Sequence, residues 1–325
     1  MLPLSAMILD RTATTKMKAM AIVLVVISHV YAVLFGRLFF VYPAGALGVS
    51  IFLILSGYGL MESFKQHGLD GFWRKRLARG LVPYLIFLLV YCAYRMVANG
   101  EFPIFNLRYW FVEYIVIWYV LFYFIMKYCL KCRWLLLSIA AIAIFLLMPC
   151  LQAQQSLSFM AGILISEKKD AVASISRKQL KQIAVSCVLI SFLAFFVAQW
   201  VAACRSHFDP TSMQLLHAVK YIAHDDMLQK FILTDDDMLQ KFLQILTKLP
   251  LGLFVIIMMT LLDHVKIPLL EPIGRISYEI YLVQDPFYRQ LPGGNWRVVA
   301  FFFALAIVSY SLHVATKKVC KWLRL

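Results

Sequence analysis

Residues 18–35 read Lys18-Ala-Met-Ala-Ile-Val-Leu-Val-Val-Ile-Ser-His29-Val-Tyr-Ala-Val-Leu-Phe35, an apolar run that contains one histidine. A run of this length predicts a membrane-spanning helix. Lys18 and His29 are eleven positions apart, about three helical turns, so both side chains share one face roughly 16 Å apart along the axis. Lys18 can reach the lipid headgroups, whereas His29 lies within the hydrocarbon. A titratable imidazole at that depth is a candidate functional group. Hydrogen bonding between packed helices is the alternative role.

The composition is that of a helical membrane protein. Of the 325 residues, 62% are hydrophobic and 15% are charged, and the mean hydropathy is +0.78. Soluble domains contain about 25% charged residues. The net charge of +15 would suggest nucleic-acid binding in a soluble chain. Here the basic residues occupy short gaps between apolar runs, so we expect membrane lipids, and no nucleic acid, as their partners.

Ten apolar runs predict an all-α fold, a polytopic bundle of ten transmembrane helices that forms a single domain over residues 1–325. The runs cover residues 18–37, 44–62, 80–98, 109–127, 133–150, 156–166, 182–203, 249–264, 267–288 and 296–316. Lys and Arg concentrate in alternate gaps, at 63–79, 127–133 and 167–181, and again after residue 316. By the positive-inside rule, these gaps and both termini, N and C, are cytoplasmic.

Residues 204–248 form a long non-apolar segment, which ten-span parity places outside. Its basic residues, Lys241 and Lys248 among them, are balanced by aspartates, and the sequence Asp-Asp-Met-Leu-Gln-Lys-Phe occurs at both 225–231 and 236–242. An eleven-residue period places Met, Leu and Phe of both copies on one helical stripe. We predict an external amphipathic helical insert between spans seven and eight. It either shapes an acceptor site or is a tandem duplication without a role.

Three basic residues, Lys75, Arg76 and Arg79, precede the apolar part of the third span. Arg76 and Arg79 are three positions apart and share one face of a helix start. Guanidinium groups bind phosphates through paired hydrogen bonds, and a helix N-terminus adds partial positive charge. The pattern indicates a site for a phosphorylated cofactor at the cytoplasmic surface. Alternatively, these basic residues set the orientation of the protein in the membrane and bind lipid headgroups.

Two carboxylates lie inside predicted spans. Glu113 is expected at about the depth of His29, where it could orient the imidazole; extension toward the membrane surface is the alternative. Glu279 belongs to the hydroxyl-rich stretch Ser277-Tyr-Glu-Ile-Tyr281, which fits a substrate groove or hydrogen bonding between helices. The pair Cys129-x-x-Cys132 has no second pair in the sequence, so we predict no metal site.

The second span reads Gly45-Ala-Leu-Gly48-Val-Ser-Ile-Phe-Leu-Ile-Leu-Ser56-Gly-Tyr58-Gly-Leu60. Its small residues predict the close approach of a neighbouring helix or of a slim acyl chain.

Together these stretches resemble the acyltransferase-3 family of integral-membrane O-acyltransferases, which modify bacterial surface glycans and related acceptors. The resemblance rests on the order and spacing of Lys18-x10-His29, residues 48–59, Arg76-x-x-Arg79 with Pro83, Trp110-Phe, Phe159-x-x-Gly162 and Ser277-Tyr-Glu-Ile-Tyr-Leu282. It implies an acyl-CoA donor, expected to be acetyl-CoA, and a carbohydrate or lipid-linked carbohydrate acceptor. It also implies a multi-pass protein of the bacterial cytoplasmic membrane.

In this resemblance His29 matches the family's essential histidine, Lys18 its basic partner, and Arg76 with Arg79 its arginine pair. Gln284 stands where members often carry a histidine. The predicted catalytic residues are His29, Lys18 and Glu113. The predicted donor-binding residues are Arg76, Arg79 and Lys75. The predicted substrate-binding residues are Ser56, Tyr58, Ser277, Tyr278, Glu279 and Tyr281. His29 is expected to act as general base. A transporter or flippase is the alternative function, and the sequence leaves the oligomeric state open.

Overall fold

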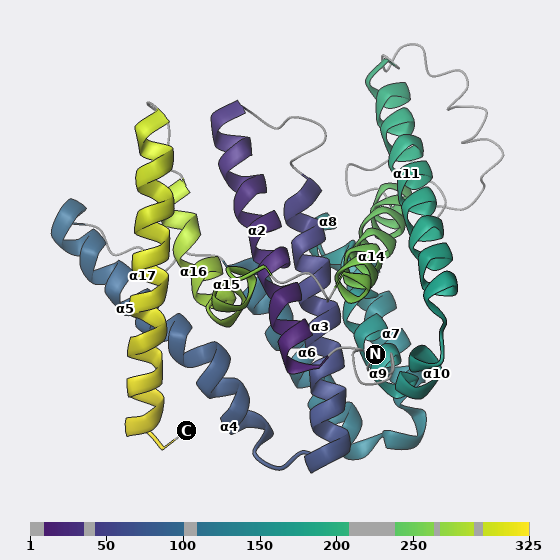
Figure 1. Cartoon of the computed structure of the whole chain (residues 1–325), viewed down its shortest axis with the longest axis horizontal. Helices are drawn as coiled ribbons and strands as arrows, with labels where there is room; N and C mark the ends of the chain where they lie inside the picture. The colour runs from purple at the N-terminus through teal and green to yellow at the C-terminus, as the bar shows by residue number, and fades with distance from the viewer. Residues whose placement is uncertain are drawn as a thin grey trace.

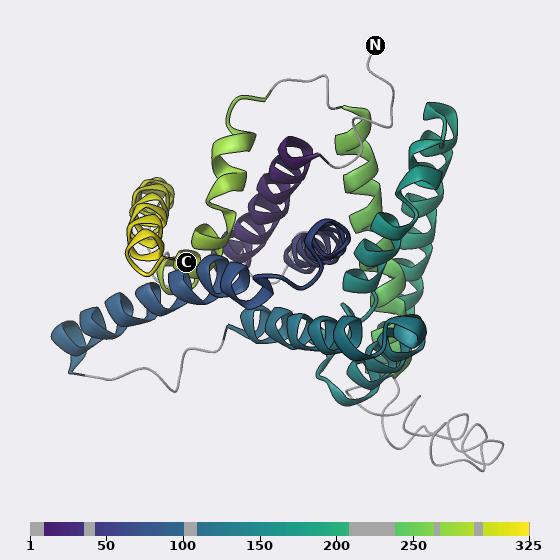
Figure 2. The same cartoon turned by 90° about the horizontal axis from the view of Figure 1, so that it is seen from below.

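The computed structural model of the chain describes residues 10–35, 43–100, 109–207, 238–262, 267–288 and 295–324, which are all-α (Figure 1). The helices are α2 (Arg11–Phe35), α3 (Pro43–His67), α4 (Phe72–Arg76), α5 (Val82–Asn99), α6 (Trp110–Tyr128), α7 (Arg133–Leu147), α8 (Cys150–Ala153), α9 (Ser158–Glu167), α10 (Lys169–Ala173), α11 (Arg177–His207), α14 (Met238–Leu261), α15 (Leu270–Arg275), α16 (Ser277–Tyr288) and α17 (Asn295–Trp322). Figure 2 shows α2 and α3 toward the middle of the bundle, with α17 and α11 on opposite sides.

Eight helical stretches in the described part of the chain are long and apolar enough to cross a membrane, so the protein is a multi-pass membrane protein. They cover Arg11–Leu34, Ala44–His67, Phe72–Ala98, Trp110–Tyr128, Leu130–Leu147, Arg177–Val201, Met238–Leu261 and Trp296–Trp322. Each of them overlaps one of the ten predicted spans.

The other two predicted spans, 156–166 and 267–288, form short helices, so eight of the ten predicted spans have spanning length among the described residues. Helix α9 has 10 residues and is about 15 Å long, half of the roughly 30 Å hydrocarbon core. The second stretch is divided into α15 and α16 at Ile276. Phe159 and Leu282 in these helices are fully buried. Their apolar sequences therefore reflect burial among other helices rather than contact with lipid.

Glycines let α3 pack at backbone distance against α2 and α9. A Cβ atom on Gly48 would lie 2.4 Å from a carbonyl oxygen of α2, and one on Gly57 would lie 2.1 Å from a carbonyl oxygen of α9. Reciprocally, a Cβ on Gly162 of α9 would lie 1.9 Å from a carbonyl oxygen of α3. The predicted close approach is confirmed at Gly48 and Gly57. At Gly59 it is not, since a Cβ there would meet nothing within 4 Å.

The three basic gaps meet at one end of the bundle. Glu62, near the end of α3, pairs with Lys169 of α10 at 3.0 Å. Arg133, at the start of α7, pairs with Glu167 at the end of α9 at 2.8 Å. The short helix α9 therefore returns the chain to the end from which α7 departs, and the alternation of basic gaps predicted from the sequence is preserved.

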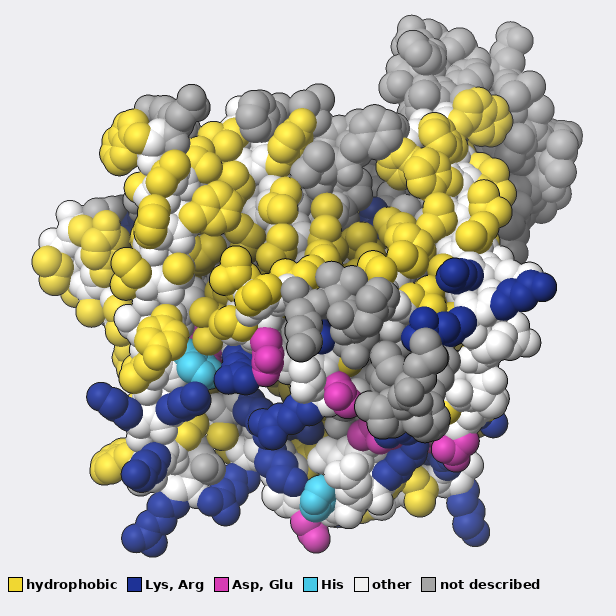
Figure 3. Space-filling view, viewed as in Figure 1, with side chains coloured by type: hydrophobic (Ala, Val, Ile, Leu, Met, Phe, Trp, Pro, Cys, Tyr) yellow, Lys and Arg dark blue, Asp and Glu magenta, His cyan; other side chains and the backbone are white. Residues whose placement is uncertain are grey.

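The C-terminal part of α17 lies at this same end. The Arg74 guanidinium donates to the backbone carbonyl of Arg324, and the Cys320 thiol lies 3.5 Å from the carbonyl oxygen of Ala78. Figure 3 shows Lys and Arg side chains gathered toward this end, while hydrophobic side chains cover the opposite half of the visible face. The positive-inside rule predicts that this basic end faces the cytoplasm.

Most of the predicted external insert, residues 208–237 with the first repeat copy, lies outside the described residues. The remainder differs from the prediction, because α14 begins at Met238. Residues 238–248 therefore form the first part of a membrane-crossing helix, in which Lys241 and Lys248 are buried.

We expect Gly162→Ala to destabilise the bundle by about 1–3 kcal/mol, because the new methyl group would clash with the α3 backbone. The measurement is the midpoint of thermal unfolding of the purified protein in a non-ionic detergent. Gly59→Ala is the matched control and should leave the midpoint unchanged. A wild-type midpoint for Gly162→Ala would contradict the close approach of α3 and α9.

Candidate active site

Helix α2 carries both Lys18 and His29 and is packed between α3 and α15. A Cβ on Gly274 of α15 would lie 1.9 Å from a carbonyl oxygen of α2, so these helices touch through their backbones. Ser28, beside His29, is buried against Gly45 near the start of α3. Because α3 ends at the basic end, His29 lies toward the opposite end of the bundle. The Nδ1 atom of His29 is buried.

Lys18, Arg76 and Arg79 form a group that we call the basic cluster. The charged side chains that interact electrostatically with the Lys18 ammonium group are Arg79, Arg76 and Arg11. All of them are positive. No ion pair joins the basic cluster to a carboxylate within the described residues. Lys75, the other predicted donor-binding residue, is not among the charges that act on Lys18.

The Arg76 guanidinium is held between two aromatic rings. Its central carbon lies 5.4 Å from the ring centroid of Phe72 and 5.4 Å from that of Tyr119. Such cation–π contacts orient a guanidinium without using its hydrogen-bond donors. The buried Nε of Arg76 has no hydrogen-bond partner in the part of the chain that the structure describes. Arg76 is therefore positioned by packing and retains donors for a ligand.

A π-helical turn, η1 (Leu77–Leu81), carries Arg79 between α4 and α5. Pro83 follows it, and a proline ring removes one backbone N–H and clashes with the carbonyl four residues earlier, here that of Arg79. The Tyr278 hydroxyl donates to the carbonyl oxygen of Gly80 at 3.0 Å. Tyr278, predicted to bind substrate, thus fixes the turn that places Arg79 near Lys18. Turns of this kind are frequent at functional sites.

Glu279 is buried and paired with a histidine that the sequence reasoning missed. Nδ1 of His313, on α17, lies 2.7 Å from Oε1 of Glu279, on α16. The signal for His313 was available, because it is an ionisable residue inside the predicted span 296–316, as His29 is in the first span. The pair couples α16 to α17 one residue away from Tyr278, and hence close to the turn that carries Arg79.

Glu113 is exposed near the first turn of α6, where its carboxylate acts on the Tyr84 hydroxyl of α5. No hydrogen bond or ion pair joins Glu113 to His29, although the structure describes both residues. The orientation of the His29 imidazole by Glu113 therefore stays a prediction.

The remaining predicted substrate residues have different surroundings. Ser277 and Tyr281 are buried on α16, and the ring of Tyr281 packs against that of Phe111 at 5.3 Å. Ser56 is partly buried on α3. Tyr58, also on α3, is buried and faces Glu62 and Lys169 rather than the basic cluster. The structure brings Lys18, Arg76, Arg79 and Tyr278 together, with Ser277 and Tyr281 on the same helix as Tyr278, whereas Tyr58 lies with a different group of charges.

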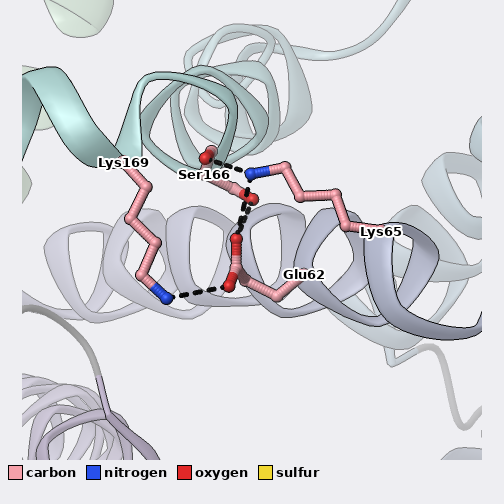
Figure 4. Close-up of polar contacts among 4 residues, drawn as sticks. All are labelled: Glu62, Lys65, Ser166 and Lys169. Atoms are coloured by element: carbon pink, nitrogen blue, oxygen red, sulfur yellow. Dashed lines mark hydrogen bonds and ion pairs between the residues drawn. The ribbon is translucent and has the colours of Figure 1, made fainter.

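A second polar network fixes the basic end of α3 (Figure 4). The Glu62 carboxylate accepts hydrogen bonds from Ser166 at 2.6 Å, Lys169 at 3.0 Å and Lys65 at 3.2 Å. The hydrogen bond to Glu62 raises the pKa of Lys169 above its ordinary value, so the pair stays charged at neutral pH. The network joins α3 to α9 and α10, which reinforces the glycine contact between α3 and α9.

In the part of the chain that the structure describes, eight helical stretches are of spanning length, a core helix carries His29, and cations cluster inside the bundle. These features define a multi-pass membrane protein with polar functional groups inside its bundle. Comparison with protein families identifies the kind of membrane protein. Residues 16–315 match the family model described as an acyltransferase domain. The chain therefore belongs to the acyltransferase 3 family, and the resemblance predicted from the sequence is confirmed.

Membership of this family makes the protein an enzyme that transfers acyl groups, which sets aside the transporter and flippase alternatives. Comparison of the chain with curated proteins and with solved structures gave no match.

We expect Glu62→Gln to lower the free energy of unfolding by about 1–2 kcal/mol, because it weakens two charge-assisted hydrogen bonds from lysine. The readout is the thermal unfolding midpoint in detergent. Glu271→Gln is the matched control, since Glu271 pairs with Arg275 on the surface, where side-chain exposures are 41% and 67%. Its effect should stay below about 0.5 kcal/mol. Equal effects of the two substitutions would show that the Glu62 network does not stabilise the bundle.

Proposed function

We propose that the protein transfers an acyl group, expected to be acetyl, from cytoplasmic acyl-CoA to a hydroxyl of a cell-surface glycan or its lipid-linked precursor. Its place would be the bacterial cytoplasmic membrane. The observation that carries the proposal is the basic cluster. Lys18, Arg76 and Arg79 converge where the basic gaps meet, and no carboxylate within the described residues neutralises them.

The basic cluster suits the phosphates of coenzyme A. Charges inside a bundle are costly unless they are paired, so converging cations favour an anionic ligand. Phosphate oxygens accept charge-assisted hydrogen bonds from guanidinium and ammonium groups. Phe72 and Tyr119 hold the Arg76 guanidinium in place before a ligand arrives, which lowers the entropy lost on binding. Tyr278 has the same effect on the turn that carries Arg79.

His29 lies on the helix that carries Lys18, about 16 Å further along the axis. With its phosphates at the basic cluster, the donor can extend its pantetheine arm along α2 and bring the thioester toward His29. In the proposed reaction His29 accepts the proton of the acceptor hydroxyl, whose oxygen bonds to the acyl carbon. The carbon–sulfur bond breaks, and the thiolate of coenzyme A takes the proton back from His29. In this proposal the base lies toward the far end of α2 from the donor phosphates.

The double variant Arg76→Ala/Arg79→Ala should bind acetyl-CoA about 3 kcal/mol more weakly, roughly 100-fold in Kd, because two charge-assisted contacts are lost. Binding is measured by titration of the purified protein in detergent. Arg177→Ala, which removes an exposed arginine at the start of α11, is the control and should bind as wild type. An unchanged Kd in the double variant would show that Arg76 and Arg79 only set the orientation of the protein in the membrane and do not bind the donor.

His29→Ala should abolish acyl transfer, with a loss of about 10²–10⁴-fold if it is the general base, while the protein still inserts and binds acetyl-CoA. Lys18→Ala should have a milder effect on transfer and a larger one on donor affinity. The readout is protein-dependent release of the coenzyme A thiol in the presence of membrane glycans, and His67→Ala, at the exposed end of α3, is the control. Near-normal transfer by a well-folded His29→Ala variant would exclude the general-base role.

A further inference from the structure

Two lysines, Lys241 and Lys248, lie on the buried face of α14. Each is only 4% exposed. With Ile245, Gly252 and Ile256 they follow the helical spacing of one face, and all five residues are buried. Lys248 is ten residues after the first residue of α14, so the helix carries positive charge about 15 Å inward from its start. Neither lysine was predicted to be inside the bundle.

The two lysines differ in their partners. The Lys241 ammonium donates to the backbone carbonyl of Met148, at the end of α7, at 3.1 Å. Lys248 has no hydrogen bond or ion pair with any residue that the structure describes, and α14 packs against α8, whose Cys150 thiol interacts electrostatically with Lys248. A buried lysine cannot extend its ammonium group to the membrane surface, and an isolated charge at such a site is costly. Lys248 therefore needs an anion.

Oxygen atoms that can accept hydrogen bonds lie on the segment that faces Lys248. Gln152, on α8 with Cys150, and Ser156, in the turn that follows, have a buried Oε1 and a buried Oγ with no hydrogen-bond partner within the described ranges. Polar atoms buried in this way normally have partners, and an unused acceptor is satisfied by a ligand that brings hydroxyl groups. A sugar is such a ligand.

The polar segment lies at the level of His29. Gln155 donates to the carbonyl of Ala46 at 2.8 Å, and Ala46 directly follows Gly45, which packs against Ser28. One turn beyond Lys248, Gly252 packs against Ser50 of α3. Lys248 and His29 are thus tied to the same few residues at the start of α3, far from the basic end of that helix.

We infer that Lys248 binds the negatively charged group of an acidic sugar in the acceptor, while Gln152 and Ser156 accept hydrogen bonds from its hydroxyls. This inference rests on the proposed function, because it assigns these residues to the acceptor of the reaction in which His29 is the base. The anionic group is a carboxylate or a phosphate on the sugar. The cations at the two ends of the bundle then have different ligands, the donor phosphates at the basic cluster and the acceptor anion at Lys248.

The test measures the thermal unfolding midpoint of the purified protein in a non-ionic detergent while glucuronate, glucose 6-phosphate or neutral glucose is titrated. We expect one or both acidic sugars, and not glucose, to raise the midpoint of the wild type. Lys248→Met should weaken this binding at least tenfold, Lys248→Arg should retain part of it, and Lys178→Met, at an exposed site on α11, should leave it unchanged. The response to glucuronate against glucose 6-phosphate identifies the anion.

Two controls separate this site from the rest of the molecule. Because glucose 6-phosphate can also occupy the basic cluster, the titrations are repeated in the Arg76→Ala/Arg79→Ala background, where the dependence on Lys248 should persist. Acetyl-CoA should bind Lys248→Met and wild type equally. If acetyl-CoA binds neither protein, the proposed function fails, whereas the sugar titrations still report on Lys248.

If Lys248 serves only to pack the bundle, its substitution should change stability and leave sugar binding unchanged. A methionine fills the same space without a charge, so without ligand Lys248→Met should unfold at the wild-type midpoint or above it. Equal binding of the acidic sugars by Lys248→Met and wild type would overturn the inference, as would a wild type that responds to glucose as it does to the acids, or to none of the three. A lower midpoint for Lys248→Met together with unchanged sugar binding would identify Lys248 as a packing residue.

Discussion

The backbone contact of α3 with α2 and α9 is the constraint on which the arrangement of functional groups depends. Helices surrounded by lipid gain little from burying apolar surface against one another, so they associate through close packing and hydrogen bonds. Gly48, Gly57 and Gly162 permit that packing, and no side chain larger than hydrogen fits at these positions. With α3 held in this way, α2 has one position in the bundle, and Lys18 and His29 acquire fixed depths.

Positive charge inside the bundle occurs at two levels. At the basic end, Lys18 lies within electrostatic range of Arg76 on α4 and Arg79 on η1, and aromatic rings hold Arg76. Toward the other end, Lys241 and Lys248 project from the buried face of α14. At the basic end, carboxylates such as Glu62 and Glu167 are used in structural ion pairs with other lysines and arginines. Within the described residues no carboxylate forms an ion pair with Lys248 or with the basic cluster, and these are the cations that we assign to ligands.

Much of the fold was predictable from the length of apolar runs and from the alternation of basic gaps. The position of Lys18 and His29 on one helix followed from their spacing, and the tight packing of the second span from its glycines. Hydropathy did not distinguish α9 and α15–α16 from full spans. A helix buried among other helices and a helix in contact with lipid both consist mainly of apolar residues. The boundary of α14 was missed for a related reason: the polar residues 238–248 resemble a surface helix unless it is known which face is buried.

The contacts between distant segments were beyond single-sequence reasoning. Glu279 was selected for its hydroxyl-rich surroundings, but its partner His313 lies on another helix, and the pairing depends on how α16 and α17 pack. Tyr278, which was expected to bind substrate, also hydrogen-bonds the turn that carries Arg79, and this contact depends on how distant segments pack. Lys248 was counted among the charges of an external segment, and only the orientation of α14 shows that it is buried.

The central claim, that the donor enters at the basic end and reacts near the opposite end, is tested most directly in sealed vesicles that hold the protein in one orientation, established with a C-terminal tag. Acetyl-CoA is supplied on one side only, and protein-dependent release of the coenzyme A thiol is followed. The account predicts turnover when acetyl-CoA is on the side of the C-terminal tag, and loss of that turnover in Arg76→Ala/Arg79→Ala. Turnover with acetyl-CoA confined to the other side would contradict it.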